Sequence, residues 1–283
     1  MKIGLGLPTA DPTALVTWAR RADASRFSTL ALLDRLVYDN PEPLVALGAI
    51  VGATTRIRVQ TEVLIAPVRE TALLAKQAAT LDRLSGGRFT LGIGVGARDD
   101  DFHAAGVDPR QRGRRLDEQM AQLRRIWAGE PHAENVGPIG PAPARSGGPE
   151  VLFGGFVAAT VERVARWGDG FLGAGAPPEG MDGLFRAVER SWQEHGRSGR
   201  PRLVAQANAV LGPDTVVDEA RKNIRAYYQF FDNPDQVADA MLTTPEQVRA
   251  AITGFTDIGA DEVMLYCWSA DPDQVDRLAD VVF

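Results

Sequence analysis

Apolar segments of strand length alternate with amphipathic segments of helix length along this chain of 283 residues. The strand-like segments are 2–7, 28–34, 57–65, 88–96, 150–155, 168–175, 201–212 and 260–269. The helical segments are 12–24, 41–54, 70–85, 114–127, 157–167, 179–196, 214–231, 245–258 and 272–282. Eight strands, each followed by helix, predict one α/β domain over residues 1–283, folded as a (β/α)8 TIM barrel. A doubly wound open sheet is the alternative, although such sheets usually have fewer strands.

One segment interrupts the alternation. Residues 129–150 (GEPHAENVGPIGPAPARSGGPE) are rich in Gly and Pro and show no periodicity, which predicts a loop. The same alternation resumes after this segment. We therefore interpret it as an insertion loop in one continuous fold, with an interdomain linker as the alternative.

Composition narrows the class of partner. The net charge is -6 and no basic run of five residues occurs, which argues against a nucleic acid partner. No apolar run reaches membrane-spanning length and no secretory signal is evident, so we expect a cytoplasmic protein without a membrane segment. The single cysteine, Cys267, excludes an intramolecular disulfide. The three histidines, His103, His132 and His195, are not spaced as metal ligands, so no metal site is predicted.

A first glycine-rich segment, RLSGGRFTLGIGVG (83–96), contains a predicted strand. Gly92, Gly94 and Gly96 occupy alternate positions and therefore face one side of that strand. A dinucleotide-binding fingerprint does not fit, because GxGxxG read from Gly94 places Asp99 at the third glycine. A slot that receives a flat ring would explain all three glycines. Packing against bulky neighbours would explain one or two of them.

A second glycine-rich segment, FGGFVAAT (153–160), joins a predicted strand to a helix. Gly154 and Gly155 leave bare backbone amides near the N-terminus of that helix, where the helix dipole favours an anion. This arrangement predicts a phosphate site. A tight turn between strand and helix is the structural alternative.

Taken together, these segments resemble the signature of the bacterial-luciferase-like oxidoreductases. LAKQAATLDRLSGGRFTLGIGVG, followed by DDFHAAGV, is similar to one long block of that family, and FGGFVAATVERVARWGDGF is similar to a second. GLGLP, LLDRL and TEVLIAPVRETALLAKQ are also family-like, so the resemblance covers nearly the whole chain. It implies a (β/α)8 barrel, usually a homodimer. The cofactor would be flavin mononucleotide (FMN) or the 8-hydroxy-5-deazaflavin coenzyme F-420, bound at the C-terminal face.

The resemblance also implies particular contacts with the cofactor. Asp34 stands where the family often has an Asp-His pair beside the ring, but Arg35 replaces the histidine here. Glu62–Val63 matches a non-prolyl cis peptide that presses on the ring. The remaining contacts come from the two glycine-rich segments: Gly94 and Gly96 beside the ring or its ribityl chain, and Gly154, Gly155 and Phe156 at the phosphate.

Catalytic residues do not follow from the sequence. In the deazaflavin-dependent sugar-phosphate dehydrogenases, the position similar to Ala97 resembles a catalytic acid. Because this chain has alanine there, we do not expect a dehydrogenase of that kind. His103 and Asp34 are the candidates for proton transfer, and packing of His103 at a loop or dimer edge is the structural alternative. The charged run 98–101 is interpreted as a solvated loop or helix start.

Two functions from different classes follow. The leading hypothesis is an oxidoreductase acting on a small organic substrate. With reduced FMN and oxygen it would be a monooxygenase supplied by a flavin reductase, and with coenzyme F-420 it would transfer hydride. The alternative is a non-catalytic flavin-binding barrel, which the missing histidine at position 35 and the missing acid at position 97 leave open.

Overall fold

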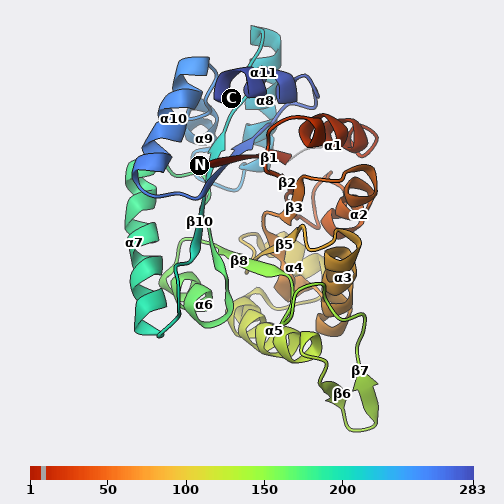
Figure 1. Ribbon diagram of the computed structural model, residues 1–283. Coiled ribbons are helices and arrows are strands. Elements are labelled where there is room, and N and C mark those ends of the chain that lie inside the picture. The colour runs from red at the N-terminus through yellow and green to blue at the C-terminus, as the bar shows by residue number, and fades with distance from the viewer. Residues whose placement is uncertain (8–10) are drawn as a thin grey trace.

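The computed structural model describes residues 1–7 and 11–283 and contains a closed barrel of parallel strands (Figure 1). The barrel strands are β1 (Lys2–Leu7), β2 (Thr29–Leu32), β3 (Arg58–Thr61), β5 (Phe89–Gly94), β8 (Glu150–Gly154), β9 (Gly170–Leu172), β10 (Arg202–Asn208) and β11 (Glu262–Tyr266). Each strand pairs with the next in chain order, and β11 returns to β1. The predicted (β/α)8 barrel is confirmed and the open sheet is excluded. Pro8, the last residue of the GLGLP segment, lies outside the described residues.

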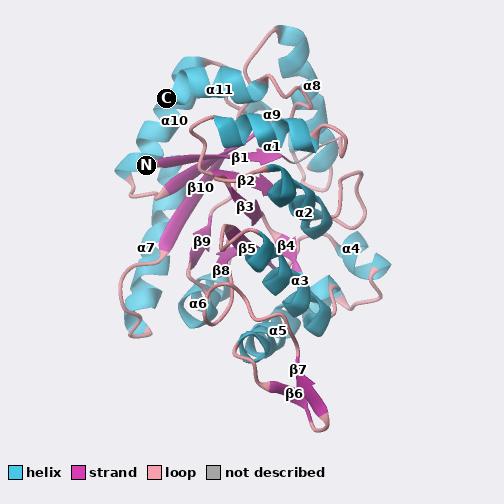
Figure 2. Cartoon of the chain, turned by 45° about the vertical axis from the view of Figure 1, so that its right-hand side comes forward, coloured by secondary structure: helices cyan, strands magenta, loops and turns pink. Residues whose placement is uncertain are grey.

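Helices surround the barrel on its outer face (Figure 2). They are α1 (Leu15–Ala24), α2 (Pro43–Ala53), α3 (Thr71–Leu84), α4 (Asp99–Ala104), α5 (Arg112–Trp127), α6 (Ala158–Trp167), α7 (Pro178–Glu194), α8 (Asp214–Tyr227), α9 (Pro234–Asp239), α10 (Pro245–Asp257) and α11 (Gln274–Val282). Two short 3-10 helices, η1 (Ala66–Val68) and η2 (Pro109–Gln111), lie in loops. None of these helices is long and apolar enough to cross a membrane.

Local sequence explains where several helices begin. Glu42 and Glu70 precede α2 and α3, and their side chains accept hydrogen bonds from Val45 N and Leu73 N. Thr244 forms a capping box with Gln247 at the start of α10. The helices then bury their apolar faces against the outer side of the strands, where most of the hydrophobic core lies.

Ion pairs fill the N-terminal end of the barrel interior. Arg202, at the start of β10, contacts Glu150 at 2.6 Å and also pairs with Glu262. Arg58, at the start of β3, contacts Glu150 at 3.0 Å. The protein's own side chains therefore occupy this end of the barrel interior.

Two segments differ from the sequence prediction. The strand predicted over 57–65 ends at Thr61 and resumes as the short β4 (Leu64–Ile65), which pairs with β5. The loop predicted over 129–150 contains a hairpin of β6 (Pro131–Ala133) and β7 (Val136–Pro138), which projects beyond α5 (Figure 2). Its strands have three residues each and are largely exposed, so they lack the apolar alternation that would have revealed them.

Candidate functional site

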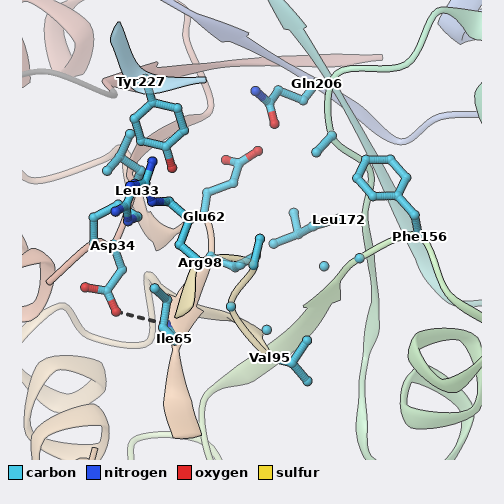
Figure 3. A pocket seen from close by; sticks show the side chains of 18 of the residues that line it. Leu33, Asp34, Glu62, Ile65, Val95, Arg98, Phe156, Leu172, Gln206 and Tyr227 are labelled. Carbon is cyan, nitrogen blue, oxygen red and sulfur yellow. Dashed lines mark hydrogen bonds between the residues drawn. The ribbon is translucent and has the colours of Figure 1, made fainter. Parts of the chain in front are cut away.

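A cavity of about 370 Å³ opens at the C-terminal ends of the barrel strands. Its volume falls within the range of sites for small molecules. All eight residues predicted to contact a cofactor line it: Asp34, Glu62, Val63, Gly94, Gly96, Gly154, Gly155 and Phe156. They come from the C-terminal ends of β5 and β8, from the residues that follow β2, β5 and β8, and from the segment between β3 and β4. Figure 3 shows part of this lining. Chain segments far apart in sequence therefore converge on one cavity, while the cofactor contacts themselves stay a prediction.

His103 does not belong to this group. Its side chain is exposed on α4, and it is not among the residues that line the cavity. It is therefore not positioned to exchange a proton with a molecule held there. His132 and His195 lie outside the cavity as well. In the described part of the chain, no cluster of three His, Cys, Asp or Glu side chains could hold a metal ion.

Gly92 and Gly94 of β5, and Gly96 just after it, face alternate residues of the segment from Thr61 to Ile65. A Cβ on each glycine would collide with one of them: Gly92 with the carbonyl oxygen of Thr61, Gly94 with Cγ2 of Val63 at 2.8 Å, and Gly96 with Cγ2 of Ile65 at 2.7 Å. The protein's own residues thus explain the missing side chains. The expectation that packing explains only one or two of these glycines is therefore wrong, because packing explains all three. Gly94 and Gly96 still line the cavity.

Between β3 and β4 the peptide Glu62–Val63 is cis, as the resemblance implies. The side chain of Val63 lies between two glycines, because a Cβ on Gly154 would also lie only 2.6 Å from Val63 Cγ1. The hydroxyl of Tyr266 donates a hydrogen bond to the carbonyl oxygen of Glu62 at 3.0 Å. These contacts fix the segment at the floor of the cavity.

The carboxyl of Glu62 is a buried ionisable group in this cavity. Its Oε2 accepts a hydrogen bond from Gln60 Nε2 at 3.0 Å, while its Oε1 has no partner among the described residues. Figure 3 shows the carboxyl directed toward Gln206. Burial raises the pKa of Glu62 to about 8, so the neutral acid predominates at neutral pH. From the sequence, only the backbone of this residue was expected to matter, and the side chain was missed.

Asp34 is tied to the protein on both carboxylate oxygens. Its Oδ2 accepts from Ile65 N at 2.8 Å, the dashed line in Figure 3, and its Oδ1 accepts from Arg69 Nη2 at 2.9 Å. Burial raises the pKa of Asp34, and Arg69 opposes this shift. These bonds give Asp34 a clear structural task, namely to anchor β4 beside the cavity.

Arg35 forms a buried ion pair with Asp101 at the start of α4. Asp101 is fully buried and accepts from Arg35 Nε at 2.6 Å, from Leu36 N at 2.9 Å and from Val37 N at 2.7 Å. Residues 98–101 do contain a helix start, since α4 begins at Asp99, but the expectation that the run is solvated is wrong for Asp101. Its carboxylate points inward because it balances a guanidinium that replaces the family's histidine.

The start of α6 forms the side of the cavity where a phosphate was predicted. Gly155 has a φ of 145°, which favours glycine, and Phe156 and Val157 are each 59% exposed. Val157 is the N-cap residue of α6, and no side chain caps the helix there. The first-turn amides are thus not used by a side chain, as an anion site requires.

Aromatic residues that were not predicted from the sequence form another wall. Tyr227, Tyr228, Phe230 and Phe231 lie at the end of α8, and all four line the cavity. The signal in the sequence is YYQFF (227–231), an aromatic run at the end of an amphipathic helix. Trp268 and Tyr266 complete this wall, and Trp268 donates to Asn208 Oδ1 at 2.8 Å.

Comparison with known proteins places this barrel in one family. Residues 2–252 match the family described as luciferase-like monooxygenase. An uncharacterized protein of Mycobacterium tuberculosis is 29% identical over 225 residues, which cover 70% of this chain and 78% of that protein. The FMNH2-dependent dimethylsulfone monooxygenase of Pseudomonas putida is 29% identical over 271 residues, with 80% and 74% covered.

Two solved structures share the fold at lower identity. A monooxygenase of Streptomyces bottropensis aligns with a TM-score of 0.79 at 22% identity, covering 99% of this chain and 97% of that one. A secondary alcohol dehydrogenase dependent on coenzyme F-420, in complex with an adduct of the coenzyme and acetone, aligns with a TM-score of 0.81 at 18% identity, covering 99% and 98%. With the family match over most of its length, this chain belongs to the luciferase-like monooxygenase family.

Proposed function

We propose that this chain is an oxidoreductase acting on a small organic substrate, and that FMN or coenzyme F-420 binds in the cavity at the C-terminal end of the barrel. The observation that carries the proposal is the convergence of the eight predicted contact residues on that single cavity. The family supports an enzyme. A relative that uses FMNH2 and a structural neighbour that holds F-420 support either coenzyme.

The residues present fit such a coenzyme. Val63 would lie under the ring, with Gly94 and Gly96 beside the ring or its ribityl chain. The backbone amides from Gly155 to Val157 would hold the phosphate, because no side chain caps α6 and no acidic residue lies in its first turn. When bound, the coenzyme would supply the two-electron chemistry that amino-acid side chains lack.

The chain itself would position the reactants and exclude water. The aromatic wall at the end of α8 covers the cavity, and the bonds from Asp34 and Tyr266 fix its floor. Glu62 holds a proton on a carboxyl that faces the cavity. We expect no side-chain nucleophile. A flavin reductase would supply FMN in its reduced form if FMN is the coenzyme, and the family leads us to expect a homodimer.

Glu62 also bears on the alternative, a non-catalytic flavin-binding barrel. That hypothesis depended on the lack of a proton-transferring group at positions 35 and 97, where arginine and alanine stand in place of the family's histidine and acid. The structure supplies such a group from the segment between β3 and β4, inside the cavity. This observation favours an enzyme over a binding protein.

The test is a titration of the purified chain with FMN and, separately, with coenzyme F-420, followed by visible absorbance and fluorescence. We expect saturable binding of one coenzyme with at least tenfold preference, which corresponds to about 1.4 kcal/mol. The variant His103→Ala is the control and should bind equally well, because His103 lies outside the cavity. Failure of both coenzymes to bind would overturn the proposal.

Turnover separates the two functions. The chain is supplied with reduced FMN and oxygen, or with reduced F-420 under anaerobic conditions, and offered small ketones, sulfones and phenols. Oxidation of the coenzyme that depends on the added compound supports the enzyme. Tight binding without such turnover by any of these compounds supports the flavin-binding barrel.

A further inference from the structure

Arg35 presents an unsatisfied hydrogen-bond donor at the wall of the cavity. Its Nε donates to Asp101, and its Nη2 donates to the carbonyl oxygen of Val37 at 3.2 Å and contacts Asp100 at 3.4 Å. Its Nη1 is buried and has no acceptor among the described residues. The residue lines the cavity, and only 5% of its side chain is exposed.

Its neighbours hold the guanidinium in one orientation. The group is planar, and the edge formed by Nε and Nη2 is bound to the protein, so Nη1 projects from the opposite edge. Asp101 is itself fixed by two backbone amides. The rings of Tyr38 and Tyr227 lie 5.8 and 5.7 Å from the guanidinium carbon. The free donor is therefore preorganised and not a side chain that swings into solvent.

The chemistry of this donor defines what it can bind. A buried donor on a charged group is costly when it has no acceptor, and that cost is recovered when a ligand supplies one. Arginine stays protonated, so it cannot take up a proton as the family's histidine can. It can only donate hydrogen bonds, and it stabilises negative charge on the atom that accepts them.

The surrounding wall defines the rest of the ligand. Tyr227, Trp268 and Phe230 line the same cavity and offer flat, largely apolar surface. Figure 3 shows the phenol of Tyr227 directed into the cavity. A planar body fits against such a wall through ring contacts and apolar burial.

We propose that Arg35 Nη1 binds an anionic or carbonyl oxygen of the substrate, and that the substrate is an aromatic or similarly planar molecule that carries this oxygen. Asp101 is a positioning residue, because it acts only through Arg35. The inference rests on the proposed function in one respect, namely that this cavity is the substrate site. It adds the class of substrate and the residue that selects it.

The experiment compares two probes that share one ring system, 2-naphthoate and 2-naphthalenemethanol. Binding is measured by tryptophan fluorescence and by ligand-observed NMR on the wild-type chain and on Arg35→Met. We expect the wild type to bind naphthoate at least tenfold more tightly than the alcohol. In Arg35→Met this preference should disappear, because naphthoate should lose more affinity than the alcohol, whose oxygen carries no charge. Arg114→Met, which removes a charge from an exposed position on α5, should keep the preference.

A second variant guards against loss of folding. Arg35→Met leaves Asp101 buried without its partner, so Arg35→Met combined with Asp101→Asn is measured beside it. This pair should fold and should also lack the preference for naphthoate. Failure of the wild type to prefer naphthoate, or persistence of the preference in the folded double variant, overturns the inference.

Coenzyme titration of the same variants distinguishes the two proposals. If Arg35→Met weakens binding of FMN or F-420 and leaves the naphthoate preference intact, Arg35 contacts the coenzyme and the substrate inference fails alone. If neither coenzyme binds the wild type but the naphthoate preference depends on Arg35, the proposed function fails and the anion site stands.

Discussion

The side chain of Val63 fills the space that a side chain on Gly94 would need. Val63 Cγ2 lies 2.8 Å from the ideal position of a Cβ on Gly94, closer than a Cβ contact normally comes. Both residues are buried or nearly so and both line the cavity. The floor of the site therefore depends on a glycine whose role is to receive a neighbouring strand segment.

Replacement of Gly94 by alanine should disturb both stability and the site. The added methyl must displace Val63, so we expect Gly94→Ala to lower the free energy of unfolding by about 1–3 kcal/mol and to weaken coenzyme binding. Urea denaturation and coenzyme titration measure the two effects. The matched control is Gly52→Ala on α2, where nothing lies within 4 Å of the new methyl. There alanine should raise stability by roughly 0.5–1 kcal/mol. Equal stability of the two variants would contradict this account of Gly94.

Removal of one partner of the Arg35–Asp101 ion pair should destabilise the protein more than removal of both partners. Asp101→Ala leaves a buried guanidinium whose remaining counter-charge is the more distant Asp100, at 3.4 Å. We expect a loss of about 3–5 kcal/mol in the free energy of unfolding. Arg35→Met combined with Asp101→Ala should lose less, because no unpaired charge remains. Urea denaturation of both variants checks the order.

A surface pair provides the comparison for that measurement. Glu118 faces Arg114 on α5 with both side chains largely exposed, so Glu118→Ala should change stability by no more than about 0.5 kcal/mol. If Asp101→Ala is no more destabilising than Glu118→Ala, the Arg35–Asp101 pair is not a structural element of the site.

Much of the fold could be predicted because its signals are local. The alternation of apolar strands with amphipathic helices reflects a sheet buried on both sides, and it depends on no long-range contact. The hairpin at 131–138 escaped prediction because its short strands are largely exposed. Strands that bury no face do not need alternating apolar residues, so the sequence carries no such pattern there. The break after Thr61 escaped prediction because apolar residues stand on both sides of it, Val59 before it and Val63 to Ile65 after it.

The candidate site was predictable only where residues match a known motif. The glycines and the Glu62–Val63 peptide were found in this way, although the glycines are needed for packing against residues 61–65. The partnership of Arg35 with Asp101 was not foreseen, since 66 positions separate them and a run of three aspartates looks solvated. The position of the Glu62 carboxyl depends on burial among β3, β10 and β11, which no local pattern encodes.

The raised pKa of Glu62 predicts a specific dependence of stability on pH. The pKa is about 8 in the folded chain, against 4.5 for a glutamate that water surrounds, so the folded state holds this proton between those values while the unfolded state has lost it. The contribution of Glu62 to the free energy of unfolding should therefore be fully present below about pH 4.5. It should fall as the pH rises from there to about 8. The fall cannot exceed about 5 kcal/mol, since each unit corresponds to about 1.4 kcal/mol.

The variant Glu62→Gln isolates this contribution. Glutamine keeps the shape and the hydrogen-bonding capacity of the neutral acid but does not ionise. Urea denaturation of both proteins at about pH 5.5 and about pH 8.5 should show the wild type losing stability relative to the variant at the higher pH. The two proteins share every other ionisable group, so the contributions of those groups largely cancel in the difference. A difference that does not change with pH would mean that Glu62 has an ordinary pKa.

The N-terminus of α6 allows a test of the phosphate site that leaves the helix intact. Val157 occupies the N-cap position with φ −100° and ψ 154°, which suits a capping side chain, and it lines the cavity. Both Val157→Asn and Val157→Asp should cap α6 and raise stability by about 0.5–2 kcal/mol. Only the aspartate places a negative charge beside the amides predicted to hold the phosphate.

We therefore expect Val157→Asp to bind FMN at least about tenfold more weakly than Val157→Asn. Riboflavin, which lacks the phosphate, should bind the two variants equally in the same fluorescence titration. Because the variants share their shape and differ in one charge, a common weakening of FMN and riboflavin would place the phosphate elsewhere.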